Sequence, residues 1–336
     1  MRRVATVLHT SDFLLCAWWA NLGAMPPFAR VLAAAVLASA LASTAAHAQA
    51  ARGDITFADG RIFPESLTST RDGAVYVGSL GHNSVYRTAP GSSRAEVWIP
   101  PGPGLQRVLG VFADEAAGVL WVCSSVPADA PAGAGASPTA LEAYGLTDAK
   151  PRASYAFPGG TGTCNDIAVS RDGIVYATDT SGGRLLRLGK NAPSFEVWLE
   201  DTAALTGVDG IAILGDGQVY VNNVRQSTLL RVPVRADGSA GPIQKLTTSR
   251  PISGPDGMRS VGGQTLLLVE GGRLDEVVVS GQTADVRVLR EGMAGPTAVT
   301  LVGDVAYVIE SRLNLRTDPT DPGPFRAVAV PYRASR

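Results

Sequence analysis

The chain has 336 residues, of which 45% are hydrophobic, and its 29 basic and 30 acidic residues leave a formal net charge of −1. This composition provides enough apolar residues for a large buried core and excludes a chain that is disordered throughout. The balanced charge gives no general attraction to nucleic acid or anionic membranes, so we expect neither as a partner. With 38 Gly and 22 Pro among short runs of Val, Leu and Tyr, the sequence favours many strands and turns, which is an all-β fold.

The N-terminal segment is predicted to precede the fold. From Met25 the chain reads MPPFAR, then the apolar VLAAAVLASALA, then STAAHAQA, which is the order of a signal peptide. We therefore expect residues 1–50 to comprise an upstream extension and a cleaved signal peptide, with Met25 as the true start and residues 51–336 as the folded domain. A membrane anchor is the alternative, although the apolar run is short for a span of about 20 residues. The sequence thus predicts an exported protein, periplasmic or extracellular, with no stable membrane insertion after cleavage.

Two cysteines remain after the predicted signal peptide, Cys123 and Cys164. An even number is typical of an oxidising compartment. Their positions on neighbouring repeats allow a disulfide, but two buried free thiols fit the sequence as well. No histidine accompanies them, so we assign neither a catalytic role.

A strand pattern recurs six times after the predicted signal peptide. The stretch from Cys164 to Thr180, CNDIAVSRDGIVYATDT, alternates apolar and other residues on both sides of Asp172-Gly173, which predicts a β-hairpin with a tight turn. The centre of its second strand has counterparts at intervals of roughly 40–55 residues, namely Tyr76, Trp121, Tyr176, Tyr220, Leu267 and Tyr307. Repeats of this length built only of strands predict a β-propeller with six four-stranded blades.

The last repeat lacks sequence for an outer strand after Tyr332. The segment DITFA at 54–58 precedes the first inner strand and can supply the missing one, so we expect the N-terminal strand to close the ring. A two-sheet sandwich or a barrel is the alternative. Either would use as many strands but would not be expected to repeat a four-strand unit in the same order.

Equivalent residues at the starts of the innermost strands predict a metal site. Counting back 11 positions from the centre of each second strand gives Glu65, Gly110, Asn165, Asp209, Asp256 and Pro296. Four of these carry side-chain oxygens, and in a propeller they converge on one end of the axis. Crowded carboxylates resist ionisation unless a cation is present. We therefore predict one divalent metal ion, Ca²⁺ first and Mg²⁺, Mn²⁺ or Zn²⁺ as alternatives, bound by Glu65, Asn165, Asp209 and Asp256. The competing interpretation is that each acidic residue serves a local turn.

Loops on the same rim hold polar residues that could contact a substrate. The candidate substrate contacts are Asn165, His82, Arg225, Arg273 and Arg312. A lone loop histidine such as His82 could also be a plain surface residue. An Ala/Pro/Gly-rich insertion at 127–140 could be a lid or a surface loop. At the ends of second strands, Asp179 and Asn223 could orient metal ligands.

Four short motifs together resemble the regucalcin/gluconolactonase family, which includes senescence-marker-protein and luciferin-regenerating enzymes. These motifs are the glutamate of FPES, the Asn-Asp pair of CNDIAVSRDG, the aspartate of GVDGIAI and the aspartate of GPDGM. The resemblance covers residues 54–333 and implies a six-bladed propeller with one divalent metal over its channel. It implies Glu65, Asp209 and Asp256 as metal ligands, and Asn165 with Asp166 as substrate or metal contacts. Two residues depart from the family pattern: Asp209 stands where asparagine is frequent, and Thr163 stands where members acting on sugar lactones often have arginine.

These implications predict a secreted, monomeric, metal-dependent hydrolase of a lactone or related ester, acting on a small-molecule substrate. The metal would polarise the carbonyl group while a carboxylate activates water. The candidate catalytic residues are Asp256, as ligand and possible base, and then Asp166. A non-catalytic metal-binding propeller that binds a small molecule or a protein partner is the alternative, and isomerase or lyase chemistry on a related scaffold is a third.

Overall fold

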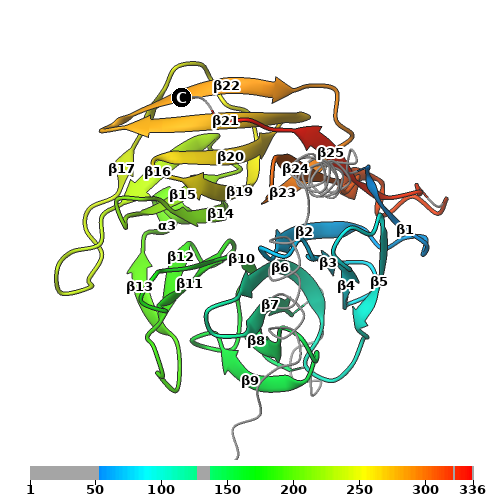
Figure 1. Ribbon diagram of the computed structural model, residues 1–336. Helices are drawn as coiled ribbons and strands as arrows, with labels where there is room; N and C mark the ends of the chain where they lie inside the picture. Colours follow the sequence, from blue (N-terminus) through cyan, green and yellow to red (C-terminus); the bar gives the residue numbers. More distant parts are fainter. Residues whose placement is uncertain (1–52, 127–136, 321, 335–336) are drawn as a thin grey trace, which may run out of the picture. The chain divides into compact units, whose positions relative to one another are not determined.

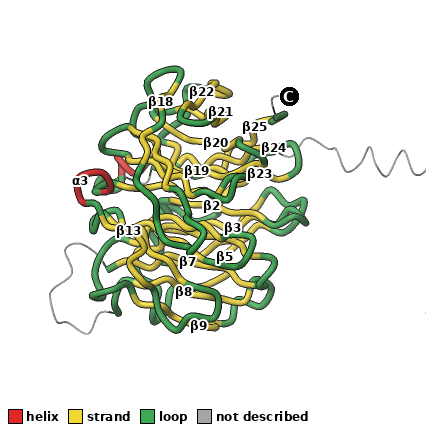
Figure 2. Tube along the Cα trace, turned by 90° about the vertical axis from the view of Figure 1, so that its left-hand side faces the viewer, coloured by secondary structure: helices red, strands yellow, loops and turns green. Residues whose placement is uncertain are grey.

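The computed structural model describes residues 53–126, 137–320 and 322–334. The predicted signal peptide and most of the 127–140 insertion lie outside the described residues. Figure 2 shows that strands and turns make up nearly all of the described chain, with helix α3 (Thr202–Leu205) as a short red segment at one edge. In these ranges no helix is long and apolar enough to cross a membrane. The described chain is therefore all-β, as predicted.

Four sheets each contain consecutive antiparallel strands, which matches the predicted repeat. The second repeat forms β6 (Arg107–Asp114), β7 (Val119–Ser125), β8 (Ala140–Gly145) and β9 (Pro151–Ala156). The third forms β10 (Cys164–Val169), β11 (Val175–Asp179), β12 (Arg184–Leu188) and β13 (Glu196–Glu200). The fourth forms β14 (Val208–Ile213), β15 (Val219–Asn223), β16 (Thr228–Val232) and β17 (Gln244–Lys245). The fifth forms β19 (Pro255–Gly262), β20 (Thr265–Glu270), β21 (Arg273–Ser280) and β22 (Thr283–Arg290), with β18 (Thr247–Thr248) parallel to β22.

One eight-stranded sheet joins the first and last repeats. The first repeat contributes β2 (Pro64–Ser69), β3 (Val75–Ser79), β4 (Ser84–Thr88) and β5 (Arg94–Ile99). The last repeat contributes β23 (Pro296–Val302), β24 (Val305–Glu310) and β25 (Arg326–Pro331), with a 3₁₀ turn, η1 (Leu313–Leu315), before β25. Between the two repeats lies β1 (Ile55–Phe57), which pairs antiparallel with β25 and parallel with β5. The N-terminal strand therefore lies beside the last strand of the chain, where the sequence placed it.

The first strand of every repeat lies at the inner edge of its sheet. Each inner strand contacts the next, in the order β2, β6, β10, β14, β19, β23 and back to β2. Figure 1 shows these six strands gathered in the middle, with the later strands of each repeat farther out. Apolar side chains of facing sheets fill the spaces between them: Val85 packs in one cluster with Leu120, and Leu185 with Val208. This burial of apolar surface between sheets holds the inner strands in place.

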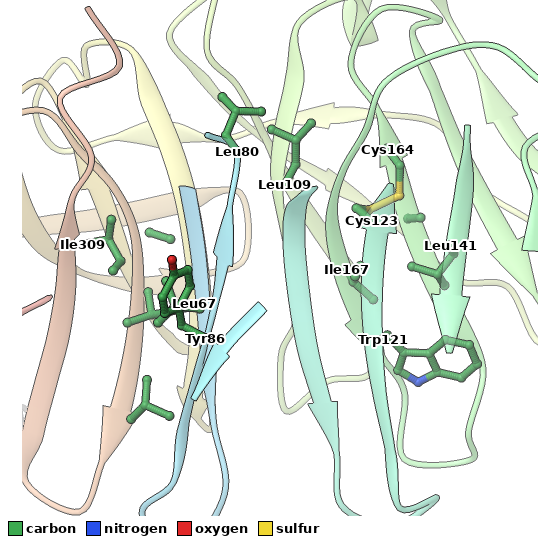
Figure 3. Packing of buried hydrophobic residues seen from close by; sticks show 14 of the residues in the cluster. Leu67, Leu80, Tyr86, Leu109, Trp121, Cys123, Leu141, Cys164, Ile167 and Ile309 are labelled. Atoms are coloured by element: carbon green, nitrogen blue, oxygen red, sulfur yellow. A yellow bond between two sulfur atoms is a disulfide. The ribbon is translucent and has the colours of Figure 1, made fainter. Parts of the chain in front are cut away.

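A disulfide links two neighbouring sheets. Cys123 on β7 and Cys164 on β10 are bonded, with their Cα atoms 5.2 Å apart, beside the buried side chains of Leu141 and Ile167 (Figure 3). The two cysteines therefore form a disulfide, which was one of the two alternatives that the sequence left open. Because β10 begins at Cys164, the bond also fixes the start of the strand that carries Asn165.

Candidate functional site

A β-bulge interrupts the start of each innermost strand. The last regular pair before each bulge is Pro64–Ser79, Val108–Ser124, Cys164–Asp179, Val208–Asn223, Pro255–Glu270 or Pro296–Glu310. The residue after each pair leaves the hydrogen-bond ladder, and a bulge re-aims its side chain. The residues in this position are Glu65, Leu109, Asn165, Asp209, Asp256 and Thr297. The four oxygen-bearing residues of the prediction therefore hold equivalent positions.

The register differs by one residue from the prediction in two repeats. Leu109 and Thr297 hold the equivalent positions, whereas Gly110 and Pro296 lie beside them. The reason is the length of the hairpin, which is one residue longer in the second repeat and one residue shorter in the sixth than in the others. A fixed count from the second strand therefore misses both positions.

The four predicted metal ligands line a single small cavity. Its walls are formed by Glu65, Asn165, Asp209 and Asp256 with Ser66, Asp166, Gly257, Thr297 and Ala298. The volume is about 10 Å³, which is room for about one water molecule or one metal ion. The side chains are largely withdrawn from solvent, since Glu65 is 6%, Asn165 8% and Asp209 7% exposed. The fold thus brings together residues that lie up to 191 positions apart in the sequence (65 to 256).

The carboxyl groups of this cavity are held in an unfavourable electrostatic environment. Asn165 Nδ2 donates hydrogen bonds to Asp209 Oδ2 at 2.9 Å and to Thr180 Oγ1 at 3.0 Å. Burial and the negative charge of Asp166 raise the pKa of Asp209 to about 7. Burial and the charge of Asp209 also raise the pKa of Glu65 and the pKa of Asp256 well above their usual ranges. Repulsion between these groups would be relieved by either protons or a cation.

Side chains from neighbouring repeats fix the backbone of the cavity. Thr178 Oγ1 donates to the carbonyl oxygen of Asp209 at 2.8 Å, and Asn222 Nδ2 donates to the carbonyl oxygen of Asp256. Both donors lie two residues after the centre of a second strand, and Cys123 of the disulfide holds the same position in its repeat. Neither Thr178 nor Asn222 is predicted from the sequence as a site residue, although comparing the repeats at this position could have found them.

Asp166 lines the cavity but is bound to an arginine. Arg259 Nη1 donates to both carboxylate oxygens, at 3.0 and 2.9 Å, and the backbone N–H groups of Ile167 and Ile211 donate to the same carboxylate. Arg259 Nη2 also donates to the carbonyl oxygen of Val111 at 3.2 Å, so this side chain connects the fifth repeat to the second and third. The contacts favour a structural role for Asp166 over the role of a base.

The predicted rim residues lie away from the cavity. Among the described residues that line it, none is His82, Arg225, Arg273 or Arg312. His82 Nδ1 lies 3.0 Å from the hydroxyl oxygen of Tyr86, and Arg312 donates to a backbone carbonyl. Arg273 forms ion pairs with two glutamates of its own repeat, at 3.6 and 3.4 Å. Arg225 is exposed. A substrate contact with any of these four residues remains a prediction.

The two residues predicted to orient metal ligands instead organise loops. Asp179 is fully buried and accepts hydrogen bonds from Arg184 and from the backbone N–H groups of Thr163 and Gly182. Asn223 donates to the carbonyl oxygens that surround the end of α3. The Oδ1 of Asn223 in turn accepts hydrogen bonds from the backbone N–H groups of Arg225 and Gln226.

The donor chemistry of the cavity fits a hard divalent cation. Three carboxyl groups and one amide oxygen are ligands of the type that Ca²⁺ and Mg²⁺ prefer, and the cavity has the volume of a single ion. In the ranges that the structure describes, however, no group of three or more His, Cys, Asp or Glu side chains is arranged so that it could hold a metal ion. The side chains bond to one another, so a cation would compete with protons and with the Asn165–Asp209 hydrogen bond.

Without metal, Asp209→Asn is expected to stabilise the protein at alkaline pH. The folded state raises the pKa of Asp209 to about 7, whereas an exposed aspartate has a pKa of about 3.9. The folded chain therefore binds more protons between these values, and the stability contributed by this carboxyl is lost as the pH rises through about 7. Thermal unfolding in chelator should show the variant melting about 3 °C or more above the natural chain at pH 8. The difference should shrink toward pH 5; equal melting at pH 8 would contradict the assignment.

Solved structures of similar fold include enzymes and an allergen. Mala s 1, the major allergen of Malassezia sympodialis, has 13% sequence identity over 83% of this chain and 96% of its own, with a TM-score of 0.64. A gluconolactonase from Xanthomonas campestris has 15% identity over 81% of this chain and 87% of its own, with a TM-score of 0.61. A luciferin-regenerating enzyme has 14% identity over 84% of this chain and 98% of its own, with a TM-score of 0.59.

These structures are regucalcin-like propellers, so the resemblance expected from the sequence is confirmed at the level of the fold. The chain is an all-β protein of the propeller class. No protein-family model matches the sequence, and no curated protein matches it significantly. At these identities the shared feature is the fold, and the chemistry must be argued from the cavity.

Proposed function

We propose that this chain is an exported hydrolase of a lactone or related ester that uses one divalent metal ion. The ion, Ca²⁺ first, would be held by Glu65, Asn165, Asp209 and Asp256. One observation carries the proposal: four oxygen-bearing side chains, each placed by a β-bulge at an equivalent position, meet at one ion-sized cavity. The gluconolactonase among the structures of similar fold supports the reaction class.

The proposed architecture is a six-bladed propeller whose ring is closed by β1. It is supported by the six inner strands, each of which contacts the next around a complete cycle. It is also supported by the pairing of β1 with both β25 and β5. In such a ring, the ends of the inner strands that carry the cavity open on one face.

Each residue of the cavity has a distinct part in the proposed reaction. When bound, a divalent ion supplies Lewis-acid polarisation of the substrate carbonyl and stabilises negative charge on its oxygen. Burial and the negative charge of neighbouring carboxylates raise the pKa values of Asp256 and Asp209, so either carboxyl group could accept the proton of an attacking water. Asn165 orients Asp209 through its 2.9 Å hydrogen bond. Asp166, neutralised by Arg259, keeps the strand start in place.

The proposed export is supported by the disulfide. Cys123 and Cys164 are bonded between two sheets, and such bonds persist mainly in oxidising compartments. The signal-peptide pattern after Met25 points to the same compartment.

A non-catalytic binding protein is the second candidate, and one observation favours it. The cavity holds about 10 Å³, which suits an ion but not the ring of a lactone, and the predicted rim cations do not line it. A binding protein would need only the ion and an exposed surface around it.

A lactone panel with and without chelator distinguishes these two functions. We expect hydrolysis of at least one lactone or aryl ester when Ca²⁺, Mg²⁺ or Mn²⁺ is present and loss of that hydrolysis in EDTA, because the carboxyl groups alone lack a positive charge for the developing oxyanion. Calorimetric titration of each metal into the chelated protein measures binding separately. Tight metal binding without turnover would favour the binding protein, and turnover that survives chelation would overturn the metal-dependent mechanism.

A further inference from the structure

A second and much larger cavity lies at the opposite ends of the inner strands. Its volume is about 510 Å³, in the range of small-molecule pockets. It is bounded by the far ends of β10, β14 and β19, whereas Asn165, Asp209 and Asp256 lie at the near ends of the same strands. The four residue steps from Asn165 to Val169 correspond to about 13 Å along a strand. The large cavity is therefore separate from the proposed metal site.

The walls of this cavity combine apolar surface with a few polar groups. The apolar part comes from Val169, Ile174, Ile213, Leu214 and Val234. The polar part includes Arg171, Asp172, Arg187, Asp216 and the phenol of Tyr176. Apolar walls with few polar groups are the usual composition of small-molecule sites.

The acidic groups of the cavity already have donors. Asp172 accepts a hydrogen bond from Ser170 Oγ at 2.5 Å. Asp216 accepts from Tyr220 at 2.9 Å and from Arg231 at 3.3 Å. Arg187 Nη1 donates to Glu196 at 2.6 Å, whereas the Nε of Arg187 is buried without a hydrogen-bond partner among the described residues. The two carboxylates and the Arg187 guanidinium therefore each have a partner within the protein, and none of them requires a ligand of opposite charge.

Two further donors in the same walls have no acceptor among the residues that the structure describes. The guanidinium of Arg171 is exposed and forms no hydrogen bond or ion pair with any residue that the structure describes. Tyr176 is 3% exposed, and its hydroxyl donates no hydrogen bond to any residue that the structure describes. Because Tyr176 lines the cavity, a ligand oxygen that enters it could accept this proton in place of water.

The tyrosines at the equivalent position of two other repeats donate their phenolic protons within the protein, unlike Tyr176. Tyr76 accepts from Arg87 at 3.3 Å and donates to the carbonyl oxygen of Leu146 at 2.9 Å, so both of its roles are filled. Tyr220 donates to Asp216. Of these three tyrosines, only Tyr176 lines the large cavity and has no hydrogen-bond acceptor among the described residues.

We propose that this cavity binds a small carboxylate with an apolar body, such as an aromatic or medium-chain carboxylic acid. The carboxylate would accept hydrogen bonds from Tyr176 and Arg171, while the apolar body would lie against the five aliphatic side chains of the wall. A neutral ligand would leave Arg171 without a counter-charge, and a cation would be repelled by it.

The test uses 2-naphthoate as the probe, with 2-naphthamide as its uncharged match, in calorimetric titrations of the full chain. We expect the acid to bind about tenfold more tightly than the amide, because only the acid pairs with the arginine. Arg171→Met and Tyr176→Phe should each weaken binding of the acid about fivefold or more. Equal affinity for acid and amide, or no binding of the acid at millimolar concentration, would overturn the proposal.

Matched variants locate the binding. Arg71 holds the equivalent turn position in the first repeat, where it pairs with Glu115, so Arg71→Met should leave naphthoate affinity unchanged. Ser260→Trp places a large side chain at the cavity wall and should abolish binding. Glu65→Gln, at the proposed metal site, should leave it unchanged. Binding that survives Ser260→Trp, or that is lost in Glu65→Gln, would assign the probe to another site.

Discussion

Glu65→Gln and Asp256→Asn are each expected to lower metal affinity and metal-dependent hydrolysis by more than about 100-fold. Each change keeps the shape of the side chain and removes one negative charge from a cavity in which several carboxyl groups would share one cation. Loss of residues that merely support metal ligands already costs about 10–100-fold in affinity or activity, and a lost ligand should cost more. Both quantities are measured on the same preparation, by calorimetry and by the initial rate on the most active lactone.

Glu142→Gln is the matched control for these two variants. Glu142 is also a buried glutamate, and burial likewise raises its pKa, but it hydrogen-bonds to Ser154 and does not line the cavity. We expect its metal affinity and rate to equal those of the natural chain. If Glu65→Gln and Asp256→Asn kept full activity, with circular dichroism showing an intact fold, the proposed mechanism would be wrong.

The fold could be predicted from the sequence because each repeat carries its own signal. The alternation around Tyr176 and Tyr220 and the turns before them recur at similar spacing, and every copy must bury the same faces against its neighbours. The missing outer strand of the last repeat then pointed to residues 54–58, and β1 within this segment pairs with β25. These features depend only on local pattern and on the order of the repeats.

The positions of the candidate metal ligands could be predicted only where the hairpin length is constant. Counting from the second strand reached Glu65, Asn165, Asp209 and Asp256 because their four hairpins have the same length. It missed Leu109 and Thr297 because one residue more or less in a turn shifts the count without changing the hydrophobic pattern. Register within a sheet is fixed by pairing, which a single sequence does not display.

The contacts made by long side chains could not be predicted from the sequence. Arg259 reaches Asp166 across 93 positions, and no pattern in GPDGMRS indicates the direction of that side chain. The predicted rim arginines show the same limit. Arg273 forms an ion pair with Glu270, and Arg312 donates to a backbone carbonyl, so neither side chain lines the cavity. Repeat register places a residue's backbone, whereas the end of an arginine side chain is placed by tertiary packing.

Arg259→Met is expected to destabilise the protein by about 3–5 kcal/mol, because it leaves the carboxylate of Asp166 buried without its cation. Asp166 is 4% exposed, and Arg259 supplies hydrogen bonds to both of its oxygens. Unfolding in guanidinium chloride measures the loss. The exposed pair of Arg71 and Glu115 gives the comparison, since Arg71→Met should cost less than about 1 kcal/mol.

The double variant Arg259→Met/Asp166→Asn separates the stabilising role of the pair from catalysis by Asp166. It removes both charges, so we expect it to recover at least about half of the stability that Arg259→Met loses. If Asp166 only positions the strand start beside Asn165, the refolded double variant should retain lactone hydrolysis within about tenfold of the natural chain. Loss of all activity with recovered stability would instead identify Asp166 as the base, and a cost below about 1 kcal/mol for Arg259→Met would show that the pair does not hold the inner strands.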